Sequence, residues 1–153
     1  MRGTLVTKGY WNRRDATSET IGPDGWLATG DIATRDEDGY LFIVDRKKDM
    51  ILTAGHNIYP AELEQAIARH ADVSMVAAAG FPDEEKGELA HAFVVPRSGS
   101  ALTQEVLLAD CRQHLAAYKI PRAVHFVDDL PKTSSGKIMR RALMTPEKDE
   151  VHS

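Results

Sequence analysis

Residues 55–67 read GHNIYPAELEQAI, and here short β segments give way to a helix. Pro60 suits the first turn of a helix, because its missing N–H would have no hydrogen-bond partner there. Leu63, Ala66 and Ile67 stand at i, i+3 and i+4, so they form one apolar stripe. Two glutamates near the start complement the helix dipole. The sequence therefore predicts a helix that begins at Pro60 and buries one face.

Apolar segments after this helix predict a sheet. Strands are expected at residues 73–81, 90–95 and 123–127. Thr103 can cap a second helix between the last two strands. The apolar face of that helix consists of Leu107, Cys111 and Leu115. From residue 50 onward the order is β-α-β-β-α-β. This order indicates an α+β fold, a small domain with a three-stranded sheet flanked by helices plus a β-hairpin.

The chain before this domain is rich in turn signals, such as Gly22-Pro23-Asp24-Gly25, and in short β segments. It shows no pattern of a compact unit with its own core. A charged run at residues 46–49 marks the predicted boundary. We therefore expect a β-rich segment at residues 1–45, a domain at 46–144 and a frayed polar tail at 145–153. The aromatic residues predicted to lie in the core are Trp26, Phe42 and Tyr59.

Composition excludes several classes of protein. The chain has 153 residues and a formal net charge of −4, without a block of basic residues, so nucleic-acid binding is not expected. A single cysteine, Cys111, cannot form an internal disulfide and favours a reducing compartment. No apolar run reaches the length of a transmembrane segment, and the N-terminus lacks a signal-peptide core. We therefore expect a cytoplasmic protein.

Generic motifs leave the chemistry open. Gly136-Lys137 is not a P-loop, because Pro131 stands where that motif needs glycine and Ile138 where it needs Ser or Thr. The six histidines show no metal-binding spacing, so no metal site is expected. Asp31, in a glycine-flanked turn, could accept hydrogen bonds from a diol, and Lys137 could reach an anion. Equally, a turn aspartate often bonds its own backbone, and a loop lysine often faces water.

Three ordered motifs resemble the adenylate-forming (AMP-binding) acyl-CoA synthetases of the fatty and aromatic acyl-CoA ligase type. The resemblance runs from Gly3 to about Leu143. Its motifs are GYWN at 9–12 with GWLATGD at 25–31, then DRKKDMI at 45–51 with GHNIYPAELE at 55–64, and finally LPKTSSGK at 130–137. Relatives of this family include firefly luciferase and the adenylation domains of peptide synthetases. The residues 55–60 look closer to acyl-CoA synthetases than to the latter.

The resemblance implies two half-reactions. A carboxylic acid attacks the α-phosphate of ATP, with Mg²⁺ on the phosphates, and gives an acyl-adenylate and pyrophosphate. The CoA thiol then attacks the adenylate and gives a thioester and AMP. The resemblance further implies that the C-terminal domain rotates between the two steps, so that each of its faces serves one of them.

The resemblance also implies roles for single residues. Asp31 and Arg46 would bind the ribose of the nucleotide, and Lys48 would be the hinge. Lys137 would be the catalytic lysine, which contacts the carboxylate and the α-phosphate as charge is redistributed. The CoA-binding residues would be Gly55, His56, Tyr118, Lys119 and Arg122. For Gly55 a turn requirement is a serious alternative, and for Tyr118 packing against the loop that follows it is equally open.

Members of this family are several times longer than 153 residues, and their phosphate loop, adenine pocket and acyl tunnel precede the part matched here. We therefore expect residues 1–45 to be the end of a large N-terminal domain, the chain alone to be inactive, and its exposed apolar face to favour self-association. A free-standing CoA- or nucleotide-binding module and a purely structural interaction domain are the alternatives. The acid substrate cannot be named from these residues.

Overall fold

Residues 1–144 are described by the computed structural model of the chain, and they divide into two units between Lys48 and Asp49. The predicted frayed tail at 145–153 lies outside the described residues. The division falls three residues after the end of the predicted N-terminal segment, inside the charged run. A short 3₁₀ helix, η1 (Lys47–Asp49), spans the division.

The first unit contains a small helix and a two-stranded sheet. Strands β1 (Asp31–Arg35) and β2 (Leu41–Arg46) pair in antiparallel register from Asp31 opposite Arg46 to Arg35 opposite Leu41. The helix α1 (Arg14–Thr20) was not predicted, since the sequence indicated only β segments here. It buries no residue, so it lacks the apolar stripe by which sequence analysis detects a helix.

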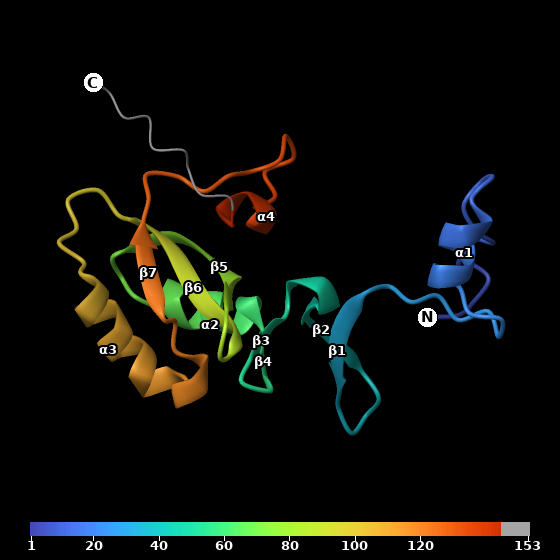
Figure 1. Cartoon of the computed structure of the whole chain (residues 1–153), viewed down its shortest axis with the longest axis horizontal. Coiled ribbons are helices and arrows are strands. Elements are labelled where there is room, and N and C mark those ends of the chain that lie inside the picture. The colour runs from blue at the N-terminus through green and yellow to red at the C-terminus, as the bar shows by residue number, and fades with distance from the viewer. Residues whose placement is uncertain (145–153) are drawn as a thin grey trace. The chain divides into compact units, whose positions relative to one another are not determined.

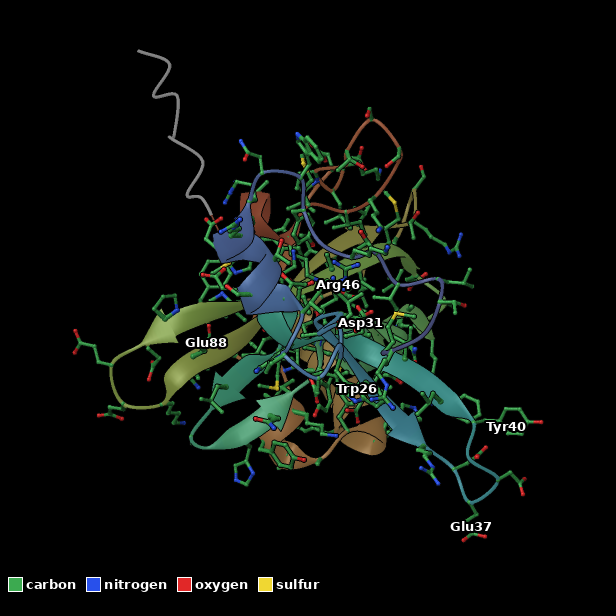
Figure 2. All side chains as sticks on the ribbon, turned by 90° about the vertical axis from the view of Figure 1, so that its right-hand side faces the viewer. Trp26, Asp31, Glu37, Tyr40, Arg46 and Glu88 are labelled. Atoms are coloured by element: carbon green, nitrogen blue, oxygen red, sulfur yellow. The ribbon has the colours of Figure 1, made fainter. Side chains whose placement is uncertain are left out.

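Large apolar side chains of the first unit are exposed. Trp26 and Phe42 are 51% and 57% exposed, so the prediction that they lie in the core is wrong, while Tyr59 of the second unit is half-buried. Along β2, Leu41 and Ile43 are exposed as well. Figure 2 shows the Tyr40 side chain pointing away from the hairpin that β1 and β2 form. Within residues 1–144, these apolar side chains of the first unit are therefore largely exposed to solvent.

The second unit contains the predicted order β-α-β-β-α-β, together with one further strand before its first helix and a short helix after its last strand. Its elements are β3 (Ile51–Thr53), β4 (His56–Ile58), α2 (Pro60–Ala68), β5 (Val73–Asp83), β6 (Gly87–Pro96), α3 (Gln104–His114), η2 (Ala117–Lys119), β7 (Ala123–Phe126) and α4 (Arg140–Leu143). The α+β fold class is confirmed, and both helices begin where the sequence indicated. Thr103 caps α3 by accepting a hydrogen bond from the N–H of Val106, at 3.4 Å.

Strand β6 lies at the centre of the sheet (Figure 1). It pairs with β5 in antiparallel register, from Val73 opposite Pro96 to Asp83 opposite Gly87, and with β7 in parallel register. The hairpin β3–β4 joins the same sheet through one pair, Thr53 opposite Gly87. The three-stranded sheet and the β-hairpin of the sequence prediction are therefore parts of one five-stranded sheet.

The main core lies between the sheet and the two long helices. Leu63 and Ile67 of α2 and Leu107 and Cys111 of α3 are 0% to 1% exposed. They pack on alternate residues of the strands, among them Val76, Ala78, Ala92 and Val94. Small alanines on the strands let the helices approach closely, and complete burial of the leucines and isoleucines contributes about 1.5–3 kcal/mol each. This core holds α2 and α3 on one face of the sheet.

The chain after β7 covers part of the other face. Leu130, Ile138 and Leu143 pack there against Ala77 and Val95. Further along this face the rings of Phe81, His91, Phe93 and His125 form a row, with His91 Nδ1 3.1 Å from His125 Nε2. Burial and the neighbouring His125 lower the pKa of His91. The segment that carries Lys137 is thus anchored by apolar contacts to the face opposite α2 and α3.

We expect Leu107→Ala to lower the free energy of unfolding by about 2–5 kcal/mol, because it opens a cavity at a fully buried position. Urea unfolding followed by far-UV circular dichroism measures the loss. The matched control is Val106→Ala, one residue earlier on α3 and 51% exposed, which should change stability by no more than about 0.5 kcal/mol. Equal losses for both variants would contradict the packing described here.

Candidate functional site

The loop that carries Lys137 is a tight hairpin, here called the Lys137 loop (residues 131–139). The N–H of Thr133 donates to the carbonyl of Lys137 at 2.8 Å, and the N–H of Lys137 donates to Oγ1 of Thr133 at 3.0 Å. Gly136 has φ +81°, a left-handed conformation that glycine adopts without strain. The base closes where the N–H of Met139 donates to the carbonyl of Pro131 at 2.8 Å. The backbone of the loop is therefore well defined by its own hydrogen bonds.

The side chain of Lys137 is exposed, and its ammonium has no hydrogen bond or ion pair within residues 1–144. Lys132, in the same loop, differs because its ammonium lies 2.5 Å from Oδ1 of Asp129. A cation on a structured loop, unpaired within the described residues, is available to bind an anion. Of the two lysines, Lys137 therefore fits the predicted catalytic role better.

The first unit brings Asp31 and Arg46 together (Figure 2). They stand opposite each other in the β1–β2 register, and Nε of Arg46 lies 3.4 Å from Oδ1 of Asp31. The backbone N–H of Asp31 donates to Oγ1 of Thr29 at 3.1 Å, which fixes the turn before β1. An ion pair this exposed contributes little to stability, typically about 0–1 kcal/mol. The pairing instead holds a carboxylate and a guanidinium side by side, a combination that suits a ribose diol.

Lys48 occupies the last position of the first unit, inside η1. A hinge requires a few residues at an element boundary whose backbone dihedrals can change. The position of Lys48 is therefore compatible with the predicted hinge.

Gly55 is required by the geometry of a turn. Ala54 and Gly55 have φ +47° and +80°, as in a two-residue type I′ turn, and they connect β3 to β4. A Cβ at Gly55 would meet no atom within 4 Å, so close packing does not select glycine here. The turn requirement, left open by the sequence, is thus the physical reason for this glycine within the described residues.

Three of the predicted CoA-binding residues meet beside this turn. The rings of His56 and Tyr118 stack, with centroids 4.6 Å apart and planes inclined by 26°. The ammonium of Lys119 lies 5.6 Å from the centre of the Tyr118 ring. Arg122 is exposed, its backbone N–H donates to the carbonyl of Ala90 at 2.8 Å, and its side chain has no hydrogen bond or ion pair within residues 1–144. Stacked rings next to cations can bind a base and phosphates, the chemistry that CoA presents.

The sequence analysis did not identify Glu62, the residue that forms an ion pair with Lys119. The ammonium of Lys119 donates to both carboxylate oxygens of Glu62, at 2.6 and 2.7 Å. This hydrogen bonding to the Glu62 carboxylate raises the pKa of Lys119 above its ordinary value. The two residues lie 57 positions apart in the chain, so only the fold reveals the pair. A phosphate that binds Lys119 must therefore share it with Glu62.

Within residues 1–144 no group of three or more His, Cys, Asp and Glu side chains is placed to hold a metal ion. No helix in this described part of the chain is long and apolar enough to cross a membrane.

Glu62→Gln should speed the acylation of Lys119 by an amine-reactive ester at pH 9. Loss of the carboxylate lowers the pKa of Lys119, so a larger fraction of its amine is neutral and reactive. Mass spectrometry of peptides containing Lys119 measures the rate. Glu85→Gln, which removes a glutamate from the β5–β6 turn, is the matched control and should leave the rate unchanged. An unchanged rate in Glu62→Gln would contradict the pairing.

Comparisons with known proteins show which family this chain resembles. Residues 62–137 match the family described as the AMP-binding enzyme C-terminal domain. The long-chain-fatty-acid–CoA ligase of Yersinia pestis is 54% identical over 147 residues, which are 96% of this chain and 26% of that protein. The long-chain-fatty-acid–CoA ligase of Bacillus subtilis (strain 168) is 45% identical over 152 residues, 99% of this chain and 27% of that protein.

Solved structures point to the same family. ATP-bound MatB from Rhodopseudomonas palustris has a TM-score of 0.89 at 36% identity, covering 97% of this chain and 29% of that chain. The o-succinylbenzoate CoA synthetase MenE of Bacillus subtilis, in complex with its acyl-adenylate intermediate, has a TM-score of 0.86 at 35% identity, covering 94% and 29%. The chain spans about a quarter of the length of the curated relatives named above. Residues 62–137 of the chain belong to the AMP-binding enzyme C-terminal domain family, and the two curated relatives named above, which match 96% and 99% of the chain, are acyl-CoA ligases.

Proposed function

We propose that this chain works as the C-terminal part of an ATP-dependent, AMP-forming acyl-CoA synthetase. The observation that carries the proposal is the exposed ammonium of Lys137, unpaired within residues 1–144, on a loop fixed by its own hydrogen bonds. The two curated relatives named above are long-chain-fatty-acid–CoA ligases, which favours a fatty acid as the substrate. The chain then supplies the catalytic lysine, the hinge and part of the CoA site to a preceding nucleotide-binding body.

In the first half-reaction a carboxylate oxygen of the acid attacks the α-phosphorus of ATP, and the bond to pyrophosphate breaks. Lys137 binds the attacking carboxylate and an α-phosphate oxygen. Its positive charge stabilises the negative charge that accumulates between the two groups in the transition state. Asp31 accepts hydrogen bonds from the ribose hydroxyls, and Arg46 donates to the same sugar.

In the second half-reaction the CoA thiol attacks the acyl carbonyl of the adenylate, and AMP leaves. Rotation about Lys48 brings the predicted CoA-binding residues to the adenylate in place of Lys137. The stacked rings of His56 and Tyr118 receive the adenine of CoA, while Lys119 and Arg122 bind its phosphates. Gly55 leaves room beside its turn, because no atom lies within 4 Å of the Cβ position.

The proposal also includes a metal ion and a cellular location. Mg²⁺ would bind the phosphates of ATP and neutralise part of their charge, and no residue of the described part of the chain is assigned to hold it. A cytoplasmic location is proposed because ATP, CoA and a lone, buried, reduced Cys111 all suit that compartment.

The chain by itself should not exchange pyrophosphate with ATP in the presence of a fatty acid, because it spans only about a quarter of its relatives. A chimera in which this chain replaces the matched segment of the Yersinia pestis ligase should restore the exchange. Radiolabelled pyrophosphate incorporation measures both proteins. Pyrophosphate exchange by the chain alone, or no exchange by a folded chimera, would contradict the proposal that the chain supplies the C-terminal part of the enzyme.

In that chimera Lys137→Ala should lower the adenylation rate by about 100-fold or more, because a positioned cation is lost from the transition state. Thioester formation from supplied acyl-adenylate should change by less than about threefold, since Lys137 serves only the first step. Lys132→Ala, in the same loop but paired with Asp129, is the matched control and should retain both activities. Equal losses in both half-reactions would refute the role given to Lys137.

The chain alone should self-associate through residues 1–45, where Leu41, Phe42 and Ile43 are exposed. Sedimentation velocity should show a concentration-dependent rise in mass, and Phe42→Ser should shift the population toward monomer. Val106→Ser, which changes a residue of α3 that is 51% exposed, is the control and should leave the distribution unchanged. A wild-type chain that stays monomeric at all concentrations would contradict self-association through residues 1–45.

A further inference from the structure

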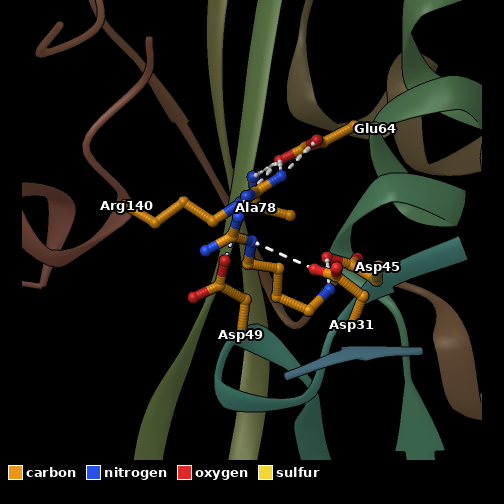
Figure 3. Close-up of polar contacts among 7 residues, drawn as sticks. Asp31, Asp45, Asp49, Glu64, Ala78 and Arg140 are labelled. Atoms are coloured by element: carbon orange, nitrogen blue, oxygen red, sulfur yellow. Dashed lines mark hydrogen bonds and ion pairs between the residues drawn. The ribbon is translucent and has the colours of Figure 1, made fainter. Parts of the chain in front are cut away.

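A charged cluster in the second unit joins segments far apart in the sequence (Figure 3). It is named the Arg140 cluster and consists of Asp49, Glu64 and Arg140. Nη2 of Arg140 lies 2.9 and 2.8 Å from the two carboxylate oxygens of Glu64, and Nε lies 3.2 Å from the first of them. Nη1 of Arg140 lies 3.4 Å from Oδ2 of Asp49. One guanidinium therefore connects η1, α2 and α4.

Glu64 is itself fixed by the sheet. Its Oε1 accepts a hydrogen bond from the N–H of Ala78 at 2.9 Å. Ala78 lies on β5, the last strand in the sheet order, so this N–H would otherwise lack a ladder partner on that side. The carboxylate thus receives donors from a strand and from Arg140 together. Its direction is set by the sheet, and the position of Arg140 follows from it.

The three side chains of the Arg140 cluster are largely shielded from solvent, which favours specific hydrogen bonds between them. The side chains of Asp49, Glu64 and Arg140 are 22%, 18% and 27% exposed. Charge-assisted hydrogen bonds from the planar guanidinium fork fix orientation as well as distance. By contrast, Arg141, the next residue, is exposed. Two adjacent arginines on one short helix therefore have different environments, which provides an internal control.

The position of the cluster relates it to the Lys137 loop and to the hinge. Arg140 directly follows Met139, whose N–H closes the base of the Lys137 loop, and it stands three residues after Lys137. Asp49 directly follows Lys48, the predicted hinge. Within the second unit, Arg140 consequently fixes the base of the Lys137 loop to the point where that unit begins.

We propose that Arg140 is a positioning residue for Lys137, an inference that rests on the proposed function. It contacts no substrate. Through Glu64 and Asp49 it holds the loop base at a fixed place relative to the hinge, so that rotation of the domain delivers the Lys137 ammonium to one point. Glu64 and Glu62 are two positions apart on α2, which separates their directions by about 200° around the helix. Arg140 therefore serves adenylation and leaves the Glu62–Lys119 side unaffected.

The test uses the chimera described above with Arg140→Lys, which keeps the charge but loses the fork geometry. Adenylation kcat should fall between about tenfold and about 100-fold, because a displacement of about 1 Å at a catalytic group has an effect of this size. The KM for ATP and thioester formation from supplied acyl-adenylate should change by less than about twofold. Arg141→Lys is the matched control and should retain both half-reactions.

A second readout needs no activity. In the chain itself, Arg140→Lys should speed amide hydrogen exchange of Gly136 and Met139 by about fivefold or more, while exchange in α3 stays unchanged. Glu64→Gln should act in the same direction, and the double variant should be no worse than either single variant.

Equal loss of both half-reactions in Arg140→Lys would overturn the inference, since it would indicate a general structural role. Retention of both activities together with unchanged amide hydrogen exchange would overturn it as well. Absence of adenylation in the wild-type chimera would instead speak against the proposed function. The exchange readout would then decide alone whether Arg140 fixes the loop, with unchanged exchange overturning that claim.

Discussion

The burial of one face of α2 against the sheet is the constraint on which the rest of the second unit depends. Leu63 and Ile67 are 1% and 0% exposed, among the most buried of residues 1–144, and they set the rotation of the helix about its axis. Once that rotation is fixed, Glu62 and Glu64 must point in different directions, because successive residues of a helix are about 100° apart. Each glutamate then forms an ion pair with a basic residue from a distant part of the chain, Glu62 with Lys119 and Glu64 with Arg140. A hydrophobic contact thereby determines where two cationic groups lie.

This arrangement gives the domain two chemically different sides. One carries the stacked rings of His56 and Tyr118 with Lys119, and the other carries the loop of Lys137, whose base Arg140 holds. The two sides share α2 but no side chain. A domain built in this way can present one side or the other to a reaction centre by moving as a rigid body, without refolding. The two half-reactions of the proposed enzyme require such an exchange.

Much of this could be predicted from the sequence, since the signals are local. Proline at the first turn, the apolar spacing after it and the cap at Thr103 place α2 and α3, and apolar runs place β5 to β7. The pairs Glu62–Lys119 and Glu64–Arg140 could not be predicted, because they join residues 57 and 76 positions apart and depend on tertiary packing. Helix α1 was missed because it buries nothing, and Trp26 was placed in a core that residues 1–144 do not provide for it. Most candidate site residues came from ordered motifs, while Tyr118, Lys119 and Arg122 came from the wider resemblance, and only the fold revealed which of them are paired.

The most direct measurement is the protection of two lysines from an amine-reactive ester in the chimera, resolved by mass spectrometry. With a non-hydrolysable ATP analogue and a fatty acid, Lys137 should be protected and Lys119 should react as in the free protein. With an acyl-adenylate analogue and CoA, Lys119 should be protected and Lys137 should become reactive again. Protection of both lysines under the same condition, or of neither under any condition, would contradict a domain that uses its two sides in turn.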